Sequence, residues 1–336
     1  MYVFKPFVFT ECSNPINEAR PSPRTFPTIF SDEKYLYSFS GYKYIVNRDT
    51  ITDYDNPKII KEIWKYNLST GVWLCLPKQQ YLPTNSEIIL GMTFKSDKLI
   101  VATWNENQSK GYLYTHHLKD ENRVVKIKAK GPIPERSIIH NFVNHGSYLY
   151  TIGNNHNLSV YRVDPETAIW EKLSPENGND FPGTTGDPNN DKPFPDVRTN
   201  FGNSSYVDLL TKDVSVIISG GNMNHTIYND IWQLNLRTLQ WTCLNKFGFT
   251  LPQPVCEHDA LITFKGKMYI FGGRIKNTND RLIEINTLYS SWLRIPRLTD
   301  ICWDAVNHYY KDLNTKTDEE LFNLGLPVNI VKSRCQ

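Results

Sequence analysis

Four arginines stand beside predicted β-strands, where neighbouring structure would hold a side-chain cation in place. They are Arg24, Arg136, Arg198 and Arg274. A guanidinium group matches a carboxylate through two parallel hydrogen bonds, and the free C-terminus of a protein is such a carboxylate. These arginines are therefore candidate substrate-binding residues. Alternatively, they brace neighbouring loops through acids such as Glu135 and Asp196.

Residue types suited to catalysis are present, but their spacing does not favour it. None of the eight histidines stands in a His-x-His or His-Glu-x-x-His arrangement, which would predict a metal site. The sequence also has no Gly-x-Ser-x-Gly nucleophile motif and no phosphate-binding loop. We expect no catalytic residue, no metal and no cofactor.

The charge balance and the distribution of apolar residues exclude further classes. The chain has 37 basic and 35 acidic residues among 336, a formal net charge of +2. Such a charge provides little field to attract nucleic acid or an anionic membrane. No apolar run reaches the length of about 20 residues that spans a bilayer, the N-terminus is a poor signal peptide, and the six cysteines form no Cys-x-x-Cys pair. A cytoplasmic location, or a nuclear one, is expected.

A phrase that recurs along the chain predicts the fold. It is an apolar residue followed by Asn or Asp, with Trp seven positions after the apolar residue: Tyr66…Trp73, Val163…Trp170, Leu234…Trp241 and Ile285…Trp292. The Asn or Asp opens a turn through its side-chain oxygen, and the Trp begins the next strand. Before each phrase lies a short strand that ends at glycine: Tyr35–Gly41, Tyr148–Gly153, Val214–Gly221 and Met268–Gly273.

These repeats resemble those of the kelch family, whose blades are four-stranded sheets arranged as a β-propeller. A fifth, eroded copy runs from the strand Lys98–Trp104 to Val125, and it lacks the tryptophan. We therefore expect an all-β propeller of five or six blades over residues 1–295. A strand within Tyr2–Thr10 would pair with the last blade to close the ring.

The antiparallel order of a blade places the arginines. The loop that enters the first strand and the loop that leaves the second lie at the same end of the sheet. Arg24, Arg136 and Arg198 precede first strands, and Arg274 follows a second strand. All four are therefore predicted at one mouth of the propeller channel.

Residues 296–336 form a second predicted domain, which is helical. Leu298, Ile301, Cys302, Ala305, Val306 and Tyr309 follow helical spacing along one face. Thr317-Asp-Glu-Glu320 is a capping box that opens a second helix, Gly325 suits its end, and Pro327 suits the first turn of a third. Helices this short are not expected to form a core alone, so they should pack on the propeller, on a partner, or on both.

This tail resembles the SOCS box, a helical element that binds elongin and a cullin. Leu298, Cys302 and Val306 match the elongin-binding stripe, and Leu326, Pro327 and Ile330 match the start of the cullin box. Arg334 departs from the family, which has an apolar residue near that position, and this leaves the choice of cullin open. Alternatively, the tail only packs on the underside of the propeller.

Longer stretches, such as Ile63–Trp73, Asp230–Trp241 and Leu298–Val331, resemble a group of kelch proteins that act as substrate receptors. That resemblance implies a non-catalytic subunit of a ubiquitin ligase with elongin B/C and cullin-2, which captures substrate proteins by their C-termini. The alternative is a kelch scaffold, cytoskeletal or signalling, without a ligase role.

Overall fold

The computed structural model describes most of the chain. The described residues are 4–12, 19–32, 34–39, 41–44, 58–60, 62–68, 70–76, 88–95, 98–105, 110–117, 124–134, 142–153, 158–173, 194–208, 211–310, 313 and 316–333. They fall into two compact units, of which the first comprises Met1–Gln79 with Gly248–Gln336, and the second Gln80–Phe247. Each unit is described by itself.

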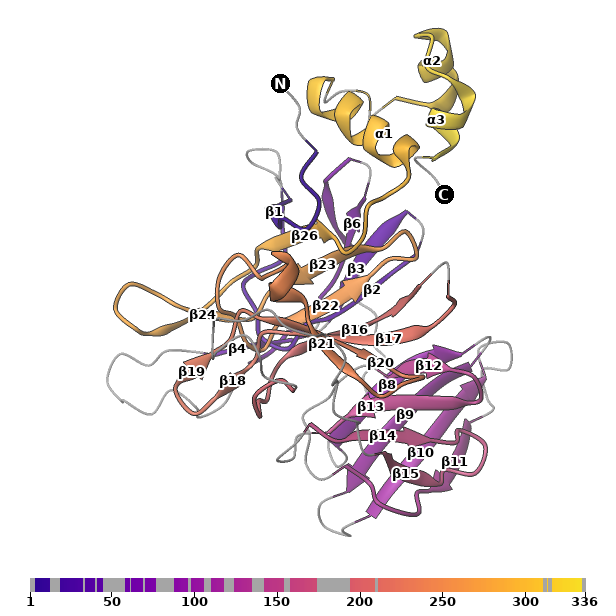
Figure 1. Ribbon diagram of the computed structural model, residues 1–336, viewed down its shortest axis with the longest axis vertical. Coiled ribbons are helices and arrows are strands. Elements are labelled where there is room, and N and C mark those ends of the chain that lie inside the picture. Colours follow the sequence, from indigo (N-terminus) through magenta and orange to yellow (C-terminus); the bar gives the residue numbers. More distant parts are fainter. Residues whose placement is uncertain are drawn as a thin grey trace. The chain divides into compact units, whose positions relative to one another are not determined.

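The described strands form five four-stranded antiparallel sheets, the blades of a β-propeller (Figure 1). Two blades lie in the first unit. The first blade consists of β2 (Thr28–Ser31), β3 (Tyr35–Phe39), β6 (Ile63–Asn67) and β7 (Trp73–Leu76). The fifth blade consists of β22 (Asp259–Ile262), β23 (Lys267–Phe271), β26 (Leu288–Trp292) and β1 (Thr10–Glu11). The predicted fold class, a kelch-type β-propeller, is confirmed.

The other three blades lie in the second unit, and in each the strands follow one another in sequence order. The second blade consists of β8 (Ile88–Lys95), β9 (Lys98–Asn105), β10 (Lys110–His117) and β11 (Val124–Lys128). The third consists of β12 (Val143–His145), β13 (Tyr148–Ile152), β14 (Val160–Val163) and β15 (Trp170–Leu173). The fourth consists of β16 (Gly202–Val207), β17 (Val214–Ser219), β20 (Ile231–Asn235) and β21 (Trp241–Cys243), and the 3-10 helix η1 (Leu244–Phe247) follows it.

In the part of the chain that the structure describes, three blades carry a small hairpin between their second and third strands. These hairpins pair β4 (Tyr42–Lys43) with β5 (Lys58–Ile59), β18 (Asn222–Met223) with β19 (Thr226–Ile227), and β24 (Arg274–Lys276) with β25 (Leu282–Glu284). Each extends the chain beyond the end of the blade at which the second strand stops. The hairpins therefore belong to the same end as the predicted arginines.

Apolar side chains that alternate along the strands fill the spaces between neighbouring blades. In the first unit, Leu36 and Trp73 of the first blade pack with Phe271 and Leu288 of the fifth. In the second unit, the third blade shares one core with the second blade and another with the fourth. Because each space between blades has its own core, the sequence contains repeated apolar segments of strand length and not one long apolar segment.

The repeated phrase produces the expected turn in three blades. Trp73, Trp170 and Trp241 each begin the fourth strand of a blade and lie opposite Tyr66, Val163 and Leu234. The Asn67 side-chain oxygen accepts a hydrogen bond from the backbone N–H of Thr70 at 3.0 Å, and Asn235 does the same for Thr238 at 3.1 Å. The side-chain oxygen thus shapes the turn as predicted.

For the fourth copy of the phrase, the prediction that its tryptophan begins the next strand is wrong. Trp292 ends the third strand of its blade, opposite Lys267, and does not begin a fourth. The fourth position is filled by β1 from the N-terminal segment, which pairs Thr10 with Ser290 and Glu11 with Tyr289. No hairpin to a fourth strand is therefore needed there. The N-terminal closing strand was predicted, but it lies at Thr10–Glu11, at the very end of the expected range.

Three helices follow the last strand: α1 (Leu298–Tyr309), α2 (Asp318–Asn323) and α3 (Val328–Ser333). Thr317 caps α2, with both hydrogen bonds of the predicted capping box present. Gly325 follows α2 with a φ of 84°, and Pro327 precedes α3. Figure 1 shows the helices grouped together beyond the strands of the fifth blade. The boundary at residue 296 between two domains stays a prediction.

Contrary to the expectation from their length, the helices bury a small core among themselves. Trp303, Leu321 and Val331 come from α1, α2 and α3 and pack together with Leu313, and Val306, Leu326 and Ile330 cover the edge of this group. Leu321 and Val331 have no exposed surface. Large side chains at the centre compensate for the shortness of the helices.

Candidate functional site

The segments that enter first strands and leave second strands meet at one end of the blade, as the topology predicted. Thr25 bridges Tyr42 in the first blade, Thr199 bridges Asn222 in the fourth, and Cys256 bridges Arg274 in the fifth. In the first and fourth blades, the arginine directly precedes the bridging threonine. In the fifth, Arg274 is itself the bridging residue. We call this end of a blade the mouth end.

Glycine is required where these segments cross. Gly41, Gly221 and Gly273 each have a positive φ, of 114°, 93° and 92°. A Cβ atom on any of them would lie within 3.0 Å of the carbonyl oxygen of the bridging residue, at 2.9 Å from Thr25, 2.6 Å from Thr199 and 2.4 Å from Cys256. Side chains are excluded by both conformation and space. The glycines that end the predicted strands therefore hold the mouth-end segments together.

Arg24 is fully buried and engaged with an acid from the same blade. Its Nη2 lies 3.1 Å from Glu62 Oε2, and its Nε donates to the Ser22 carbonyl at 3.0 Å. The same Glu62 oxygen accepts a hydrogen bond from Trp64 Nε1 at 3.0 Å. Burial lowers the pKa of Arg24, and the Glu62 carboxylate opposes this shift.

Arg198 repeats this arrangement in the fourth blade, with more contacts. It pairs with both carboxylate oxygens of Asp230, and its Nη2 lies 2.9 Å from Oδ2. It also donates to the carbonyls of Asp196 and Gly220 at 2.9 and 3.2 Å. Trp232 Nε1 donates to Asp230 at 2.7 Å, and the Arg198 guanidinium lies 3.9 Å from the centre of the Tyr228 ring.

Arg24 and Arg198 thus each belong to a three-residue unit of the same kind. It consists of an arginine before the first strand of the blade, an acid before the third strand, and a tryptophan on that third strand. We call it the Arg–acid–Trp unit. The acids in these units, Glu62 and Asp230, differ from the bracing acids expected from the sequence, Glu135 and Asp196. The signal was present, because Glu62-Ile63-Trp64 and Asp230-Ile231-Trp232 share an acid two positions before a tryptophan.

Arg274 lies beside two acids at the mouth end of the fifth blade. Its Nη2 pairs with Glu257, its guanidinium lies 4.8 Å from the centre of the Tyr44 ring, and its Cα lies opposite Glu284 in the small hairpin. Burial raises the pKa of Glu257, and the hydrogen bond and positive charge of Arg274 oppose this rise. Burial also raises the pKa of Glu284, although that carboxylate accepts a hydrogen bond from the Tyr44 N–H at 2.6 Å. Both carboxyl groups therefore take up a proton more readily than exposed ones.

The structure brings Arg24 and Arg274 into neighbouring segments, since the Gly273 N–H donates to the Arg24 carbonyl at 2.9 Å. Arg198 belongs to the other compact unit, and Arg136 lies outside the described residues, as does Glu135. All three described arginines are paired with acids. Their role in substrate binding stays a prediction.

The helical tail presents the predicted elongin-binding stripe on α1. Leu298 is 73% exposed, Cys302 is partly exposed, and Val306 is packed on the edge of the tail core. Of the predicted cullin-binding residues, Pro327 is exposed, whereas Leu326 and Ile330 are partly buried against that same core. Arg334 lies outside the described residues.

Among the described residues, an ion pair links the tail to the fifth blade. Lys265, in the turn between β22 and β23, lies 3.6 Å from Asp300 at the start of α1, and Arg297 also pairs with Asp300 at 3.1 Å. Within the described part of the chain, no group of three His, Cys, Asp or Glu side chains is placed to hold a metal ion. None of the described helices is long and apolar enough to cross a membrane.

Comparisons with known proteins give consistent relatives. No protein-family model matches the chain. It is 24% identical to the kelch domain-containing protein 10 homolog of Drosophila melanogaster over 97% of this chain and 64% of the relative, so it spans less than two thirds of that protein. It is also 24% identical to kelch domain-containing protein 10 of Rattus norvegicus, over 93% of this chain and 86% of the relative. Kelch domain-containing protein 2 of Bos taurus is 23% identical over 76% of this chain.

Proposed function

We propose that this chain, a kelch-repeat protein with kelch domain-containing protein 10 among its relatives, is the substrate-recognition subunit of a cullin-2 ubiquitin ligase. In this proposal the tail binds elongin B/C and cullin-2, and the propeller binds substrate proteins by their C-termini. The coarser function, a kelch protein-interaction domain, is supported by the relatives and the fold. The ligase role rests on the resemblance of the tail to a SOCS box.

The observation that carries the proposal is the exposure of Leu298. A single exposed leucine is common on protein surfaces, so the weight lies on the position of Leu298, which begins α1 and stands at the start of the predicted binding stripe. The tail core is built from Trp303, Leu321 and Val331 and does not use Leu298. The helices can therefore hold their arrangement while the N-terminal part of the stripe contacts another protein.

The elongin interaction is tested by copurification with co-expressed elongin B/C. We expect Leu298→Ala combined with Cys302→Phe to abolish copurification and to leave the melting temperature nearly unchanged, because Leu298 is largely exposed. Leu324→Ala is the matched control, since Leu324 is 60% exposed and lies outside the stripe. If the double variant retains elongin, or if wild type never binds it, the scaffold function without a ligase role is favoured.

The mouth end of the fifth blade supports the part of the proposal that concerns C-termini. Arg274 would hold the terminal carboxylate, and Glu257 and Glu284 would repel it less than ordinary carboxylates because their pKa values are raised. Arg24 lies in the neighbouring segment of the same compact unit and would assist it. For Arg136 and Arg198, substrate binding stays a prediction from the sequence. The proposal predicts binding that strengthens as pH falls towards the raised pKa values of these two acids, because their protonation removes like charge. The terminal carboxylate of the ligand, with an ordinary pKa near 3.5, loses its charge only at lower pH.

This is measured by titrating the protein with a peptide that ends in glycine and with its C-terminal amide. We expect the free peptide to bind about ten- to a hundredfold more tightly, as for a lost hydrogen bond to a charged group. Arg274→Gln should remove most of that difference, and Arg281→Gln, an exposed arginine of the same hairpin region, should not. Equal affinities for the free and amidated peptides would rule out terminal-carboxylate capture.

A further inference from the structure

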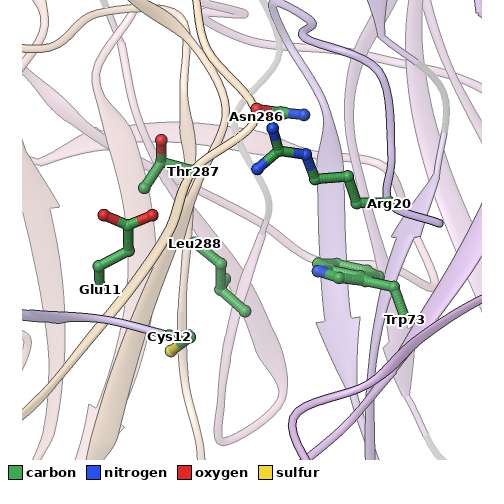
Figure 2. Close-up of a pocket in the computed structure, with 7 residues that line it drawn as sticks. All are labelled: Glu11, Cys12, Arg20, Trp73, Asn286, Thr287 and Leu288. Carbon is green, nitrogen blue, oxygen red and sulfur yellow. The ribbon is translucent and has the colours of Figure 1, made fainter. Parts of the chain in front are cut away.

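The mouth end of the fifth blade has the same crossing of segments as that of the first and fourth blades, but it lacks their Arg–acid–Trp unit. The residue before the bridging Cys256 is Val255, where the other two blades have an arginine. The residue directly before the third strand is Thr287, which lines the small pocket shown in Figure 2, where the other two blades have an acid. In place of the unit, this blade carries the pair Glu257–Arg274.

This pair differs from the others in how its acid is held. Asp230 of the fourth blade accepts hydrogen bonds at both carboxylate oxygens, from Arg198 and Trp232. Glu257 is only 3% exposed, and while one of its oxygens meets Arg274, its Oε2 atom is buried without a hydrogen-bond partner among the described residues. A buried carboxylate oxygen without a donor is costly. The pair is therefore not explained as a structural brace alone.

The backbone at both ends of the pair is fixed. Glu257 has a φ of 58°, in the left-handed region that residues with a side chain rarely adopt, and its carbonyl accepts a hydrogen bond from the Phe26 N–H at 2.7 Å. Arg274 exchanges two backbone hydrogen bonds with Cys256, at 2.8 and 3.1 Å. The carboxylate and the guanidinium can therefore separate only by rotation of their side chains.

Arg274 is thus an arginine whose partner is a carboxylate of its own chain. Its side chain is only 10% exposed in this arrangement, and the Tyr44 ring lies 4.8 Å from its guanidinium. A glutamate side chain and a free C-terminus present the same planar, charged group to a guanidinium. Either carboxylate can therefore replace the other at Arg274.

We propose that Glu257 is an internal competitor, which occupies Arg274 until the terminal carboxylate of a substrate displaces it. This inference rests on the proposed function, in which Arg274 holds that carboxylate. Because one carboxylate replaces another, the largely buried charge of Arg274 always has a partner. Glu257 gives up a contact that satisfies only one of its two oxygens. It thereby makes the site selective, since a ligand end without a free carboxylate does not displace it.

The first test measures the affinity of a peptide that ends in glycine, and of its C-terminal amide, by isothermal titration. We expect Glu257→Gln to bind the free peptide about tenfold more tightly than wild type does, because glutamine removes the competing charge. The amidated peptide should bind both proteins equally weakly. Asp280→Asn is the matched control and should bind as wild type, since Asp280 is an exposed acid in the loop of the same hairpin.

Glu284→Gln separates competition from a general loss of negative charge. Glu284 lies opposite Arg274 in the hairpin, but its carboxylate accepts the Tyr44 N–H at 2.6 Å. We therefore expect a smaller gain in affinity for the free peptide than with Glu257→Gln.

A second test needs no peptide and does not depend on the folding of Glu257→Gln. Glu257→Gly suits the left-handed backbone and leaves the space of the missing carboxylate beside Arg274. We expect sodium acetate to raise the melting temperature of this variant above its value in sodium chloride of the same concentration, because acetate binds the folded protein in that space. Wild type, in which Glu257 fills the space, should melt at the same temperature in both salts.

The outcomes distinguish this inference from the proposed function. If wild type prefers the free peptide but Glu257→Gln binds it no more tightly, Glu257 does not compete, and the proposed function stands without this inference. An equal gain with Glu284→Gln, or the absence of an acetate effect on Glu257→Gly, would also overturn it. If free and amidated peptides bind equally to wild type and to both glutamine variants, terminal-carboxylate capture fails, and this inference fails with it.

Discussion

Arg198 joins three parts of the fourth blade through one side chain. It bonds Asp230 before β20, the Gly220 carbonyl after β17, and the Asp196 carbonyl before β16. The arginine has no exposed surface, whereas the Asp230 side chain is 21% exposed. Removing the arginine alone is costly, because the Asp230 carboxylate and the two carbonyl groups then lose their hydrogen-bond donors.

Replacing Arg198 with Ala should therefore lower the free energy of unfolding by about 2–4 kcal/mol, somewhat less than for a fully buried pair. Arg198→Lys should have a free energy of unfolding between those of wild type and Arg198→Ala, because lysine keeps the positive charge but cannot form two parallel hydrogen bonds with the carboxylate. Urea denaturation followed by tryptophan fluorescence measures both, with Arg281→Ala as an exposed control. An unchanged midpoint for Arg198→Ala would mean that the Arg–acid–Trp unit is not structural, and the arginine would then be free to serve a ligand.

At the scale of single residues, the sequence predicted where the arginines lie in a blade better than it predicted which acids they pair with. The bridges Thr25–Tyr42 and Thr199–Asn222 follow from antiparallel order alone, and the structure contains them. Glu62 and Asp230 lie 38 and 32 residues from their arginines, and no local spacing relates two such residues. Acids close in sequence were the natural candidates, but the hydrogen bond that Asp196 accepts from Arg198 is made by its backbone carbonyl.

At the scale of elements, the fifth blade differs from the others because it is built from both ends of the β region. Three of its strands lie between Asp259 and Trp292, and the fourth is β1. Phe9, just before β1, stacks on Phe249 with ring centres 5.2 Å apart, and Phe249 is only 2% exposed. The N-terminal segment therefore covers both the edge of β26 and an aromatic side chain before β22.

Removing residues 1–12 should expose that edge. We expect hydrogen exchange of the β26 amides to accelerate, because an exposed edge strand opens more easily. Peptides from β13, in the other compact unit, serve as the internal reference and should change little. If β26 keeps its protection without residues 1–12, β1 does not contribute to the stability of the blade.

The fifth blade also shows what a repeat can and cannot predict. The phrase ending at Trp292 has the same spacing as the others, but spacing does not reveal which strand follows. In the first, third and fourth blades the next strand comes directly after the turn. Here Asn286 bonds to Pro21 instead of shaping a turn, because the fourth strand comes from the other end of the chain. The capping box at Thr317 was predictable because all its atoms lie within four residues.

At the scale of the whole molecule, the tail is a small helical body attached to the strands of its unit. It has its own core around Trp303 and Leu321, and the Lys265–Asp300 pair connects it to the fifth blade. Burial lowers the pKa of Lys265, and Asp300 opposes this shift. A single partly buried ion pair makes a modest contribution to stability compared with a hydrophobic core. The tail is thus suited to carry a partner without being needed to hold the blades.

Ending the chain after Pro296 should therefore leave the thermal unfolding of the propeller nearly unchanged. The tail buries its central side chains against one another, and the core between the fifth and first blades contains no residue of the tail. Calorimetry of the full and shortened chains measures this, and Lys265→Ala in the full chain isolates the connecting ion pair. Copurification with elongin B/C should be lost with the tail and retained in Lys265→Ala. If the shortened chain unfolds many degrees earlier, the helices support the blades, and the interpretation of the tail as a structural element then replaces its interpretation as a partner surface.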